Sequence, residues 1–232
     1  MHFYALNING NLKAKSRTKG FLHRAFNKLL SINKYYQLMS IFEMYLELGL
    51  KHITDLKGYD HILFIICLCA IYYFKHWKKV LVLITAFTLG HSLTLALATF
   101  GLINVSVDIV EFVIPLTIFI TATANLFQRT ESFSNVQHRF KYFAALFFGL
   151  IHGLGFSNYL RILLGGEENI VSPLFAFNIG VELGQIVIVL ILLTLAFLFN
   201  QLLFVKNREW SLVLSGAGLG ISLILMIDRW PF

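Results

Sequence analysis

Charged residues are scarce in this chain. Only 13% of its 232 residues are Asp, Glu, Lys or Arg, whereas 57% are hydrophobic and the mean hydropathy is +0.73. A soluble domain carries about 25% charged residues, so an ordinary soluble domain is excluded. Runs of eighteen or more nearly uncharged residues indicate membrane-spanning helices. We therefore expect an all-α fold in the form of one polytopic membrane helix bundle.

Acidic residues are absent from residues 1–38, a segment that holds seven basic residues. The remaining twelve basic residues equal the twelve acidic residues in number, so the net charge of +7 belongs to this arm. A nucleic-acid-binding face would need basic residues on a folded surface, and we exclude that partner. Two interpretations of the arm stay open. It is either a disordered cytoplasmic segment that contacts anionic lipid, or a non-native extension, with Met39 as the natural start of a bundle over residues 39–232.

Cysteine is nearly absent, and both cysteines, Cys67 and Cys69, lie in one apolar stretch. A helix turns by ~100° per residue, so their side chains point about 200° apart and cannot pair with each other. We expect two small packing groups, with a CxC metal site as the alternative. No path rich in Cys or Met favours copper(I).

Six segments are long and apolar enough to be predicted as transmembrane helices. They lie at about 60–76, 79–101, 108–127, 141–163, 172–204 and 210–228. Residues 40–54 mix apolar and charged side chains, which predicts an amphipathic helix lying in the membrane interface.

Basic residues fall in alternate loops. Loops 75–79, 128–141 and 205–210 are basic, whereas the second loop has no base and the fourth carries Glu167 and Glu168. The positive-inside rule therefore predicts that the three basic loops are cytoplasmic, in a plasma (inner) membrane, with both ends of the bundle outside. The basic arm conflicts with this orientation unless residues 40–56 cross as a seventh span or the arm is not native. We favour six spans.

Ionisable side chains inside these spans indicate a functional role, because placing each one in a bilayer costs several kcal/mol or more of free energy. At a rise of roughly 1.5 Å per residue, Asp60, His61 and Glu111 lie near the outer surface. By the same rise His91, His152 and Glu182 lie roughly 15 Å deep. Two tiers of this kind predict an outward-facing vestibule above a midplane site. The alternative is a set of buried polar pairs that only fix helix packing.

Small and polar residues accompany the deeper tier. Gly149 and Gly153 flank His152, while Gly180 and Gly184 surround Glu182, and GxxxG pairs let helices approach closely. Gly216 and Gly220 repeat this pattern without a polar partner, which predicts packing alone. The predicted pathway-lining residues are Ser92, Asn125, Asn178 and Gln185, with Asn125 marking a cytoplasmic exit. Thr117 and Thr121 share a helix face with Asn125 and are expected to form hydrogen bonds.

Four motifs in order carry a resemblance to a known family. They are Gly49–Ile53 with Gly58–Phe64, Thr85–Leu95, Phe148–Phe156 and Phe177–Gln185. From about Met39 onward the chain resembles the HupE/UreJ family, in particular its second branch. The family's Asp-His element falls on Asp60 and His61, and its His-Gly element falls on His152 and Gly153. The histidine and glutamate that better-studied members carry on either side of the latter are apolar residues here.

The resemblance implies a nickel permease that supplies hydrogenase or urease assembly, and imidazole with carboxylate suits nickel, cobalt or zinc. The predicted metal-binding residues are His52, Asp60, His61, His91, Glu111, His152 and Glu182. The divalent metal is the substrate of this permease, and the lipid bilayer is its other partner. Two alternatives stay open: an intramembrane zinc-dependent hydrolase, in which the metal activates a water, and a non-transporting membrane scaffold.

Overall fold

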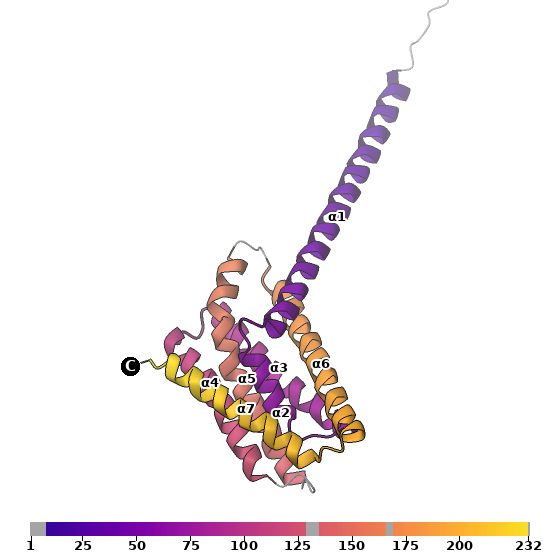
Figure 1. The fold of residues 1–232 in the computed structure, drawn as a ribbon. Helices are drawn as coiled ribbons and strands as arrows, with labels where there is room; N and C mark the ends of the chain where they lie inside the picture. The colour runs from indigo at the N-terminus through magenta and orange to yellow at the C-terminus, as the bar shows by residue number, and fades with distance from the viewer. Residues whose placement is uncertain (1–7, 129–134, 166–168, 232) are drawn as a thin grey trace, which may run out of the picture. The chain divides into compact units, whose positions relative to one another are not determined.

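The computed structural model describes the backbone of residues 8–128, 135–165 and 169–231 and the side chains of residues 26–128, 137–165 and 169–231. All regular elements in these ranges are helices (Figure 1). They are α1 (Ile8–Thr54), α2 (Asp60–Cys69), η1 (Phe74–His76), α3 (Trp77–Thr99), α4 (Val107–Phe127), α5 (Asn135–Leu164), α6 (Val171–Leu202) and α7 (Asn207–Asp228). Arg129, Glu167 and Glu168 of the predicted loops lie outside the described residues.

The chain divides into two units, Met1–Met44 and Tyr45–Phe232, with the division inside α1. In the first unit the described part of the predicted basic arm is helical, and this helix continues without a break through residue 44. Its side chains from residue 26 to residue 40 are exposed. The second unit contains the last turns of α1 and all other helices.

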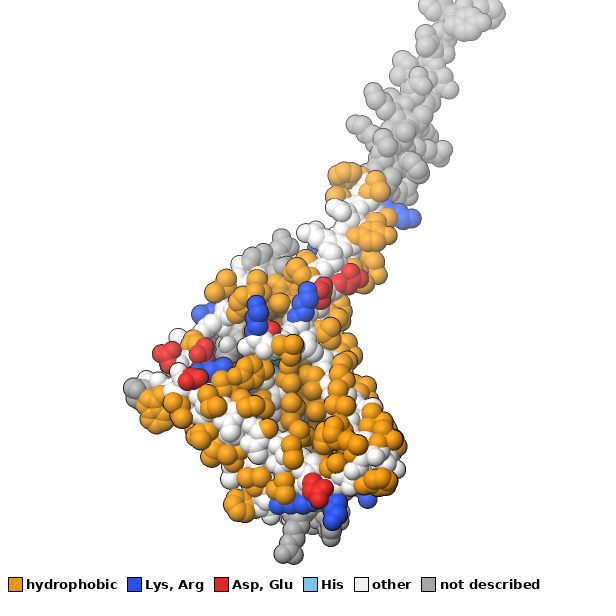
Figure 2. Space-filling view, in the orientation of Figure 1, with side chains coloured by type: hydrophobic (Ala, Val, Ile, Leu, Met, Phe, Trp, Pro, Cys, Tyr) orange, Lys and Arg blue, Asp and Glu red, His pale blue; other side chains and the backbone are white. Residues whose placement is uncertain are grey.

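Five predicted spans are confirmed as long apolar helices. In the described residues, the five helical segments with the length and hydropathy to cross a membrane are Phe74–Thr99, Val107–Phe127, Gln137–Leu164, Val171–Leu202 and Asn207–Asp228. α3 packs mainly against α5, and α4 packs mainly against α7. Hydrophobic side chains cover most of the visible face of these helices, and charged side chains gather at its ends (Figure 2).

The predicted span at residues 60–76 is not a single helix. α2 ends at Cys69 after ten residues, a length of about 15 Å, which is half of the ~30 Å hydrocarbon core. Ala70, Ile71 and Tyr72 follow without helical structure and are almost fully buried. Irregular backbone is tolerated at membrane depth only where protein surrounds it, and α2 packs against α4, α6 and α7. The six-span count is therefore not confirmed.

The predicted interfacial helix at residues 40–54 is not confirmed either. Tyr45 and Ile53 are almost fully buried in the second unit, so the last turns of α1 lie among other helices. Glycine explains this close approach, because a methyl group on Gly49 would overlap the carbonyl group of Phe177. A methyl group on Gly180 of α6 would overlap the carbonyl oxygen of Leu46 in the same way.

Most basic residues lie at one end of the helices in the second unit, and most acidic residues lie at the other, where Arg229 is also found. Lys75, Lys141 and Arg208 lie where α3, α5 and α7 begin, and Asp60, Glu111 and Asp228 lie where α2 and α4 begin and α7 ends. The guanidinium of Arg208 ties the basic end together. It donates hydrogen bonds to the carbonyl oxygens of Asn125, Leu126 and Gln128 at the end of α4, where helix carbonyls lack a full set of helical partners.

Three glycines form the seam between α3 and α5. A methyl group on Gly90 of α3 would overlap the carbonyl of Leu146 on α5. In the same way, a methyl group on Gly149 would overlap the carbonyl of Phe87, and a methyl group on Gly153 would overlap the carbonyl of His91. The predicted close approach around His152 is therefore confirmed, and it brings α5 against the turn of α3 that carries His91. On α7, by contrast, nothing lies within 4 Å of a methyl group placed on Gly216 or Gly220, so the packing predicted there is not made within the described residues.

This contrast allows a matched pair of variants. Gly149→Ala should lower the melting temperature of the detergent-solubilised protein by several degrees, because overpacking costs about 1–3 kcal/mol and 1 kcal/mol corresponds to about 2–4 °C in a chain of this size. Gly220→Ala should leave the melting temperature unchanged or raise it slightly, since alanine favours helix over glycine. Equal shifts for the two variants would contradict the close contact at Gly149.

Candidate metal centre

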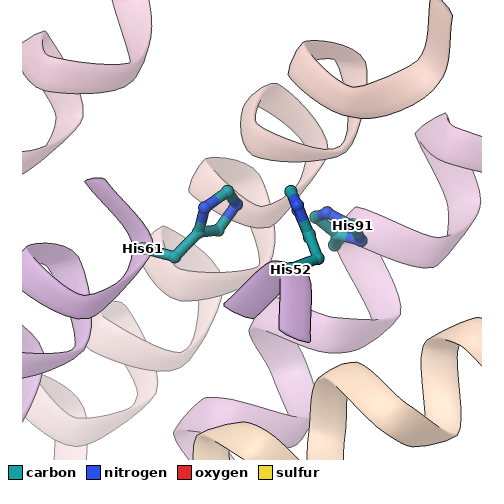
Figure 3. A group of neighbouring side chains, drawn as sticks. All are labelled: His52, His61 and His91. Carbon is teal, nitrogen blue, oxygen red and sulfur yellow. The ribbon is translucent and has the colours of Figure 1, made fainter. Parts of the chain in front are cut away.

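Three histidines from three helices converge inside the second unit. His52 lies near the end of α1, His61 in the first turn of α2 and His91 in the second half of α3. One ring nitrogen from each lies within 4.8 Å of the others, and Figure 3 shows the three rings facing a shared space. His61 and His91 are buried, and His52 is half-buried.

A fourth imidazole, that of His152 on α5, joins the group. Its ring centre lies 5.1 Å from that of His61, and its side chain is fully buried. The hydroxyl of Thr117 donates its hydrogen to the carbonyl oxygen of Ile114 at 2.7 Å. That hydroxyl therefore accepts a hydrogen bond from Nε2–H of His152, 2.9 Å away. This network assigns the proton to Nε2 and leaves the lone pair on Nδ1.

Five ring nitrogens of this four-histidine cluster (His52, His61, His91 and His152) are buried without a hydrogen-bond partner. They are Nε2 of His52, Nε2 of His61, both ring nitrogens of His91 and Nδ1 of His152. Each unsatisfied buried polar group costs about 1–3 kcal/mol, and native structures contain few of them. Such a concentration of unused nitrogens in one place is typical of a ligand site.

The spacing of the cluster is close to that of a metal centre. Zinc-like ions hold their ligands about 2.1 Å away in a tetrahedron, so two bound nitrogens lie about 3.4 Å apart. The nitrogens of His52, His61 and His91 lie within 4.8 Å of one another, so a bound ion needs them to approach one another by up to about 1.4 Å. Small side-chain rotations supply a movement of this size.

Aromatic rings enclose the four-histidine cluster. Phe156 lies against His52 with ring centres 4.0 Å apart, and Phe64 and Phe87 each lie 5.1 Å from His152. Phe177 stacks on Phe156 with an interplanar angle of 9°. These rings fix the imidazole orientations and lower the local dielectric, which strengthens any interaction between the nitrogens and a cation.

A cavity of about 210 Å³ connects the cluster with the acidic end of the helices, since exposed Asp55, Gly58 and Glu111 line it together with His52 and His61. Asp60 and Arg229 also line it and form an ion pair at 2.9 Å. Oδ2 of Asp60 is used in that pair, and Oδ1 is buried without a partner. Asp60 and Glu111 therefore line the same cavity as His52 and His61.

The predicted division into two tiers is wrong for His61. His61 is only 7% exposed and lies beside His152 instead of near the surface. The depth estimate assumed that a full-length span begins at residue 60. α2 is instead a short interior helix, so its first turn already lies at the level of His91 and His152. His52 reaches the same level because the end of α1 enters the helix packing.

Glu182 is not among the groups that converge at the cluster. Its carboxylate accepts a hydrogen bond from the Thr85 hydroxyl at 2.7 Å, and one helical turn further on Gln185 accepts one from Thr88 at 2.7 Å. Both contacts join α6 to α3. Asn178 does approach the cluster: its side chain lies beside His91, and its Oδ1 is buried without a partner.

The other two predicted pathway residues lie apart from the cluster. Ser92 is half-buried next to His91 in sequence, but adjacent helix residues do not face each other. Asn125 lies at the basic end, where its amide donates to the carbonyl of Cys67 at 2.7 Å and to the Ser215 hydroxyl at 3.2 Å. It also lines a separate cavity there.

The sequence did not predict two partnerships at the site, that of Arg229 with Asp60 and that of Thr117 with His152. Arg229 follows the last helix and reads as an ordinary flanking base, so nothing in the sequence signals its pairing with Asp60. Thr117 was expected to form a hydrogen bond, and it does, but its partnership with His152 was not predicted. The matching depths of the two residues on neighbouring spans are the signal that could have found it.

The family comparison agrees with the motifs. A family model described as HupE / UreJ protein matches residues 28–229, and the chain therefore belongs to the HupE/UreJ family, which comprises metal-transport and accessory membrane proteins. The match covers every histidine of the cluster and begins within the basic arm. Comparison with curated proteins and with solved structures gives no match.

Proposed function

We propose that this protein is a membrane permease for a divalent transition metal, with nickel as the principal cargo and cobalt or zinc as competitors. The five unpartnered nitrogens of the four-histidine cluster carry the proposal. Neutral imidazole is a strong ligand for borderline divalent ions, and the cluster offers nitrogen donors in place of the carboxylate-rich set that hard ions prefer.

In this proposal the metal enters at the acidic end, which faces the outside of the plasma (inner) membrane. Asp60 and Glu111 attract the ion into the outer cavity, and the histidines then replace its water ligands. The basic end, with Lys75, Lys141 and Arg208, faces the cytoplasm. Family membership supports metal transport as the activity and metalloenzyme maturation as its purpose.

Nickel entry into proteoliposomes tests the proposal. The purified full chain is reconstituted with a metal-sensitive dye inside the vesicles, and the initial rate is measured for wild type, His91→Ala and His138→Ala. Mutation of a residue that only supports a metal ligand typically costs about 10–100-fold in activity. Loss of a direct ligand in His91→Ala should lower the rate by more than this. His138→Ala, which removes a histidine at the basic end, should retain the wild-type rate.

Three outcomes separate this proposal from its alternatives. Equal rates in wild type and His91→Ala vesicles would overturn the permease. Zinc that stays bound in a one-to-one ratio after chelator treatment, without metal entry, would favour an intramembrane hydrolase instead. Failure of His91→Ala alone to fold would favour a scaffold, and His91→Gln then serves as the second variant for the rate measurement.

A further inference from the structure

A second and larger cavity lies at the basic end, away from the four-histidine cluster. Its volume is about 550 Å³, within the range of about 300–1,000 Å³ that is usual for ligand sites. The ends of α4 and α5 form most of it. Its apolar lining includes Ile120, Ala124, Phe127, Phe140, Ala144 and Phe148. Phe127 and Phe140 are 84% and 74% exposed, so the cavity is open at the surface of the helices.

One cation lies in this apolar lining. The Lys141 ammonium is half-buried and donates to the neutral Oδ1 of Asn125 at 3.4 Å, a long and weak hydrogen bond. Among the described side chains, the carboxylates in ion pairs are Glu47 and Asp60, and neither is paired with Lys141. A half-buried charge without an opposite charge beside it is costly, and within the described residues Lys141 has no charged partner.

Charge and shape together define what completes the site. The occupant needs an anionic group for Lys141 and a long apolar body for the phenylalanine-lined groove. The side-chain amide of Gln128 at the same end can donate a hydrogen bond to a headgroup. Basic pockets between transmembrane helices on the cytoplasmic side are suited to anionic lipid headgroups.

We propose that the groove between α4 and α5 binds one anionic phospholipid, with its phosphate on Lys141 and an acyl chain along Ile120, Ala124 and Phe148. This site is separate from the metal route and does not depend on the proposed transport function. The lipid fills the cavity, neutralises the lysine and connects the start of α5 to the end of α4.

Lipid retention by the purified full chain tests this site. Native mass spectrometry in mild detergent is carried out with phosphatidylglycerol and, separately, with phosphatidylethanolamine. Wild type should retain one phosphatidylglycerol per chain with an affinity at least about fivefold above that for phosphatidylethanolamine, the factor expected for one basic residue near an anionic lipid. Lys141→Gln should remove this preference, whereas Lys78→Gln, an exposed lysine at the same end, should keep it.

A second variant tests the apolar part of the site. Ala144→Phe fills the groove and should reduce retention of both lipids several-fold while Lys141 stays in place. Equal retention of the two lipids by wild type, or equal losses in Lys141→Gln and Lys78→Gln, would overturn the proposal. Displacement of the lipid by inorganic phosphate alone would also overturn it, because an acyl chain would then contribute nothing.

Discussion

Nickel should raise the melting temperature of the detergent-solubilised wild-type protein by about 5–10 °C at a free concentration one hundred times its dissociation constant. A ligand that binds only the folded state contributes about 2.7 kcal/mol at that ratio. For a chain of this size 1 kcal/mol corresponds to about 2–4 °C. The four-histidine cluster is the expected binding site, because five of its nitrogens are buried without partners.

His91→Leu should abolish this nickel-dependent shift without lowering the melting temperature measured in chelator. Both ring nitrogens of His91 are buried and unpartnered, so leucine removes two unsatisfied polar atoms and keeps a similar volume. Replacement of this kind is often neutral or stabilising. His138→Leu should keep the full shift. A large drop in the chelator-treated melting temperature of His91→Leu would instead indicate that His91 mainly supports the fold.

The long apolar helices could be predicted from the sequence because a bilayer demands about 20 apolar residues per span. The same reasoning failed at residues 70–73, since Ala70, Ile71 and Tyr72 are as apolar as the helix before them. Hydropathy predicts whether a segment is surrounded by apolar groups, but it does not predict the conformation of the backbone. A buried irregular segment and a buried helix therefore have the same hydropathy. Only the backbone conformation, in which α2 ends at Cys69, distinguishes the two.

The sequence identified the histidines of the candidate metal centre, but it did not predict how they are arranged. His52, His61, His91 and His152 were all candidates, because ionisable groups in apolar segments are rare and functional. Their convergence at one level could not be predicted, because depth was counted along helices assumed to start at the surface. The position of His52 depends on Gly49 and Gly180, which allow α1 to approach α6 closely.

Asp60 and Arg229 should have opposite effects on the rate of metal entry. The two side chains line the outer cavity and form an ion pair, so the carboxylate that would attract a divalent ion is held by a competing cation. Charges that line a cleft with apolar walls change association rates by about tenfold or more. Asp60→Asn leaves the positive guanidinium in the route and should lower the initial nickel rate in proteoliposomes by about tenfold.

Arg229→Gln frees both oxygens of Asp60 and should raise the rate at low ionic strength, with a smaller gain at high salt because ions screen the exposed part of the route. The double variant should lie between the two single variants, since it removes both charges. Lys57→Gln, an exposed base at the same end, should have little effect. Equal decreases in Asp60→Asn and Arg229→Gln would show that the pair is needed as a structural link between α2 and the end of α7. A lower rate in Asp60→Asn together with a higher rate in Arg229→Gln requires that the cation moves past both charges. The direction of the Arg229→Gln effect therefore shows whether the ion pair lies on the path of the metal or only links two helices.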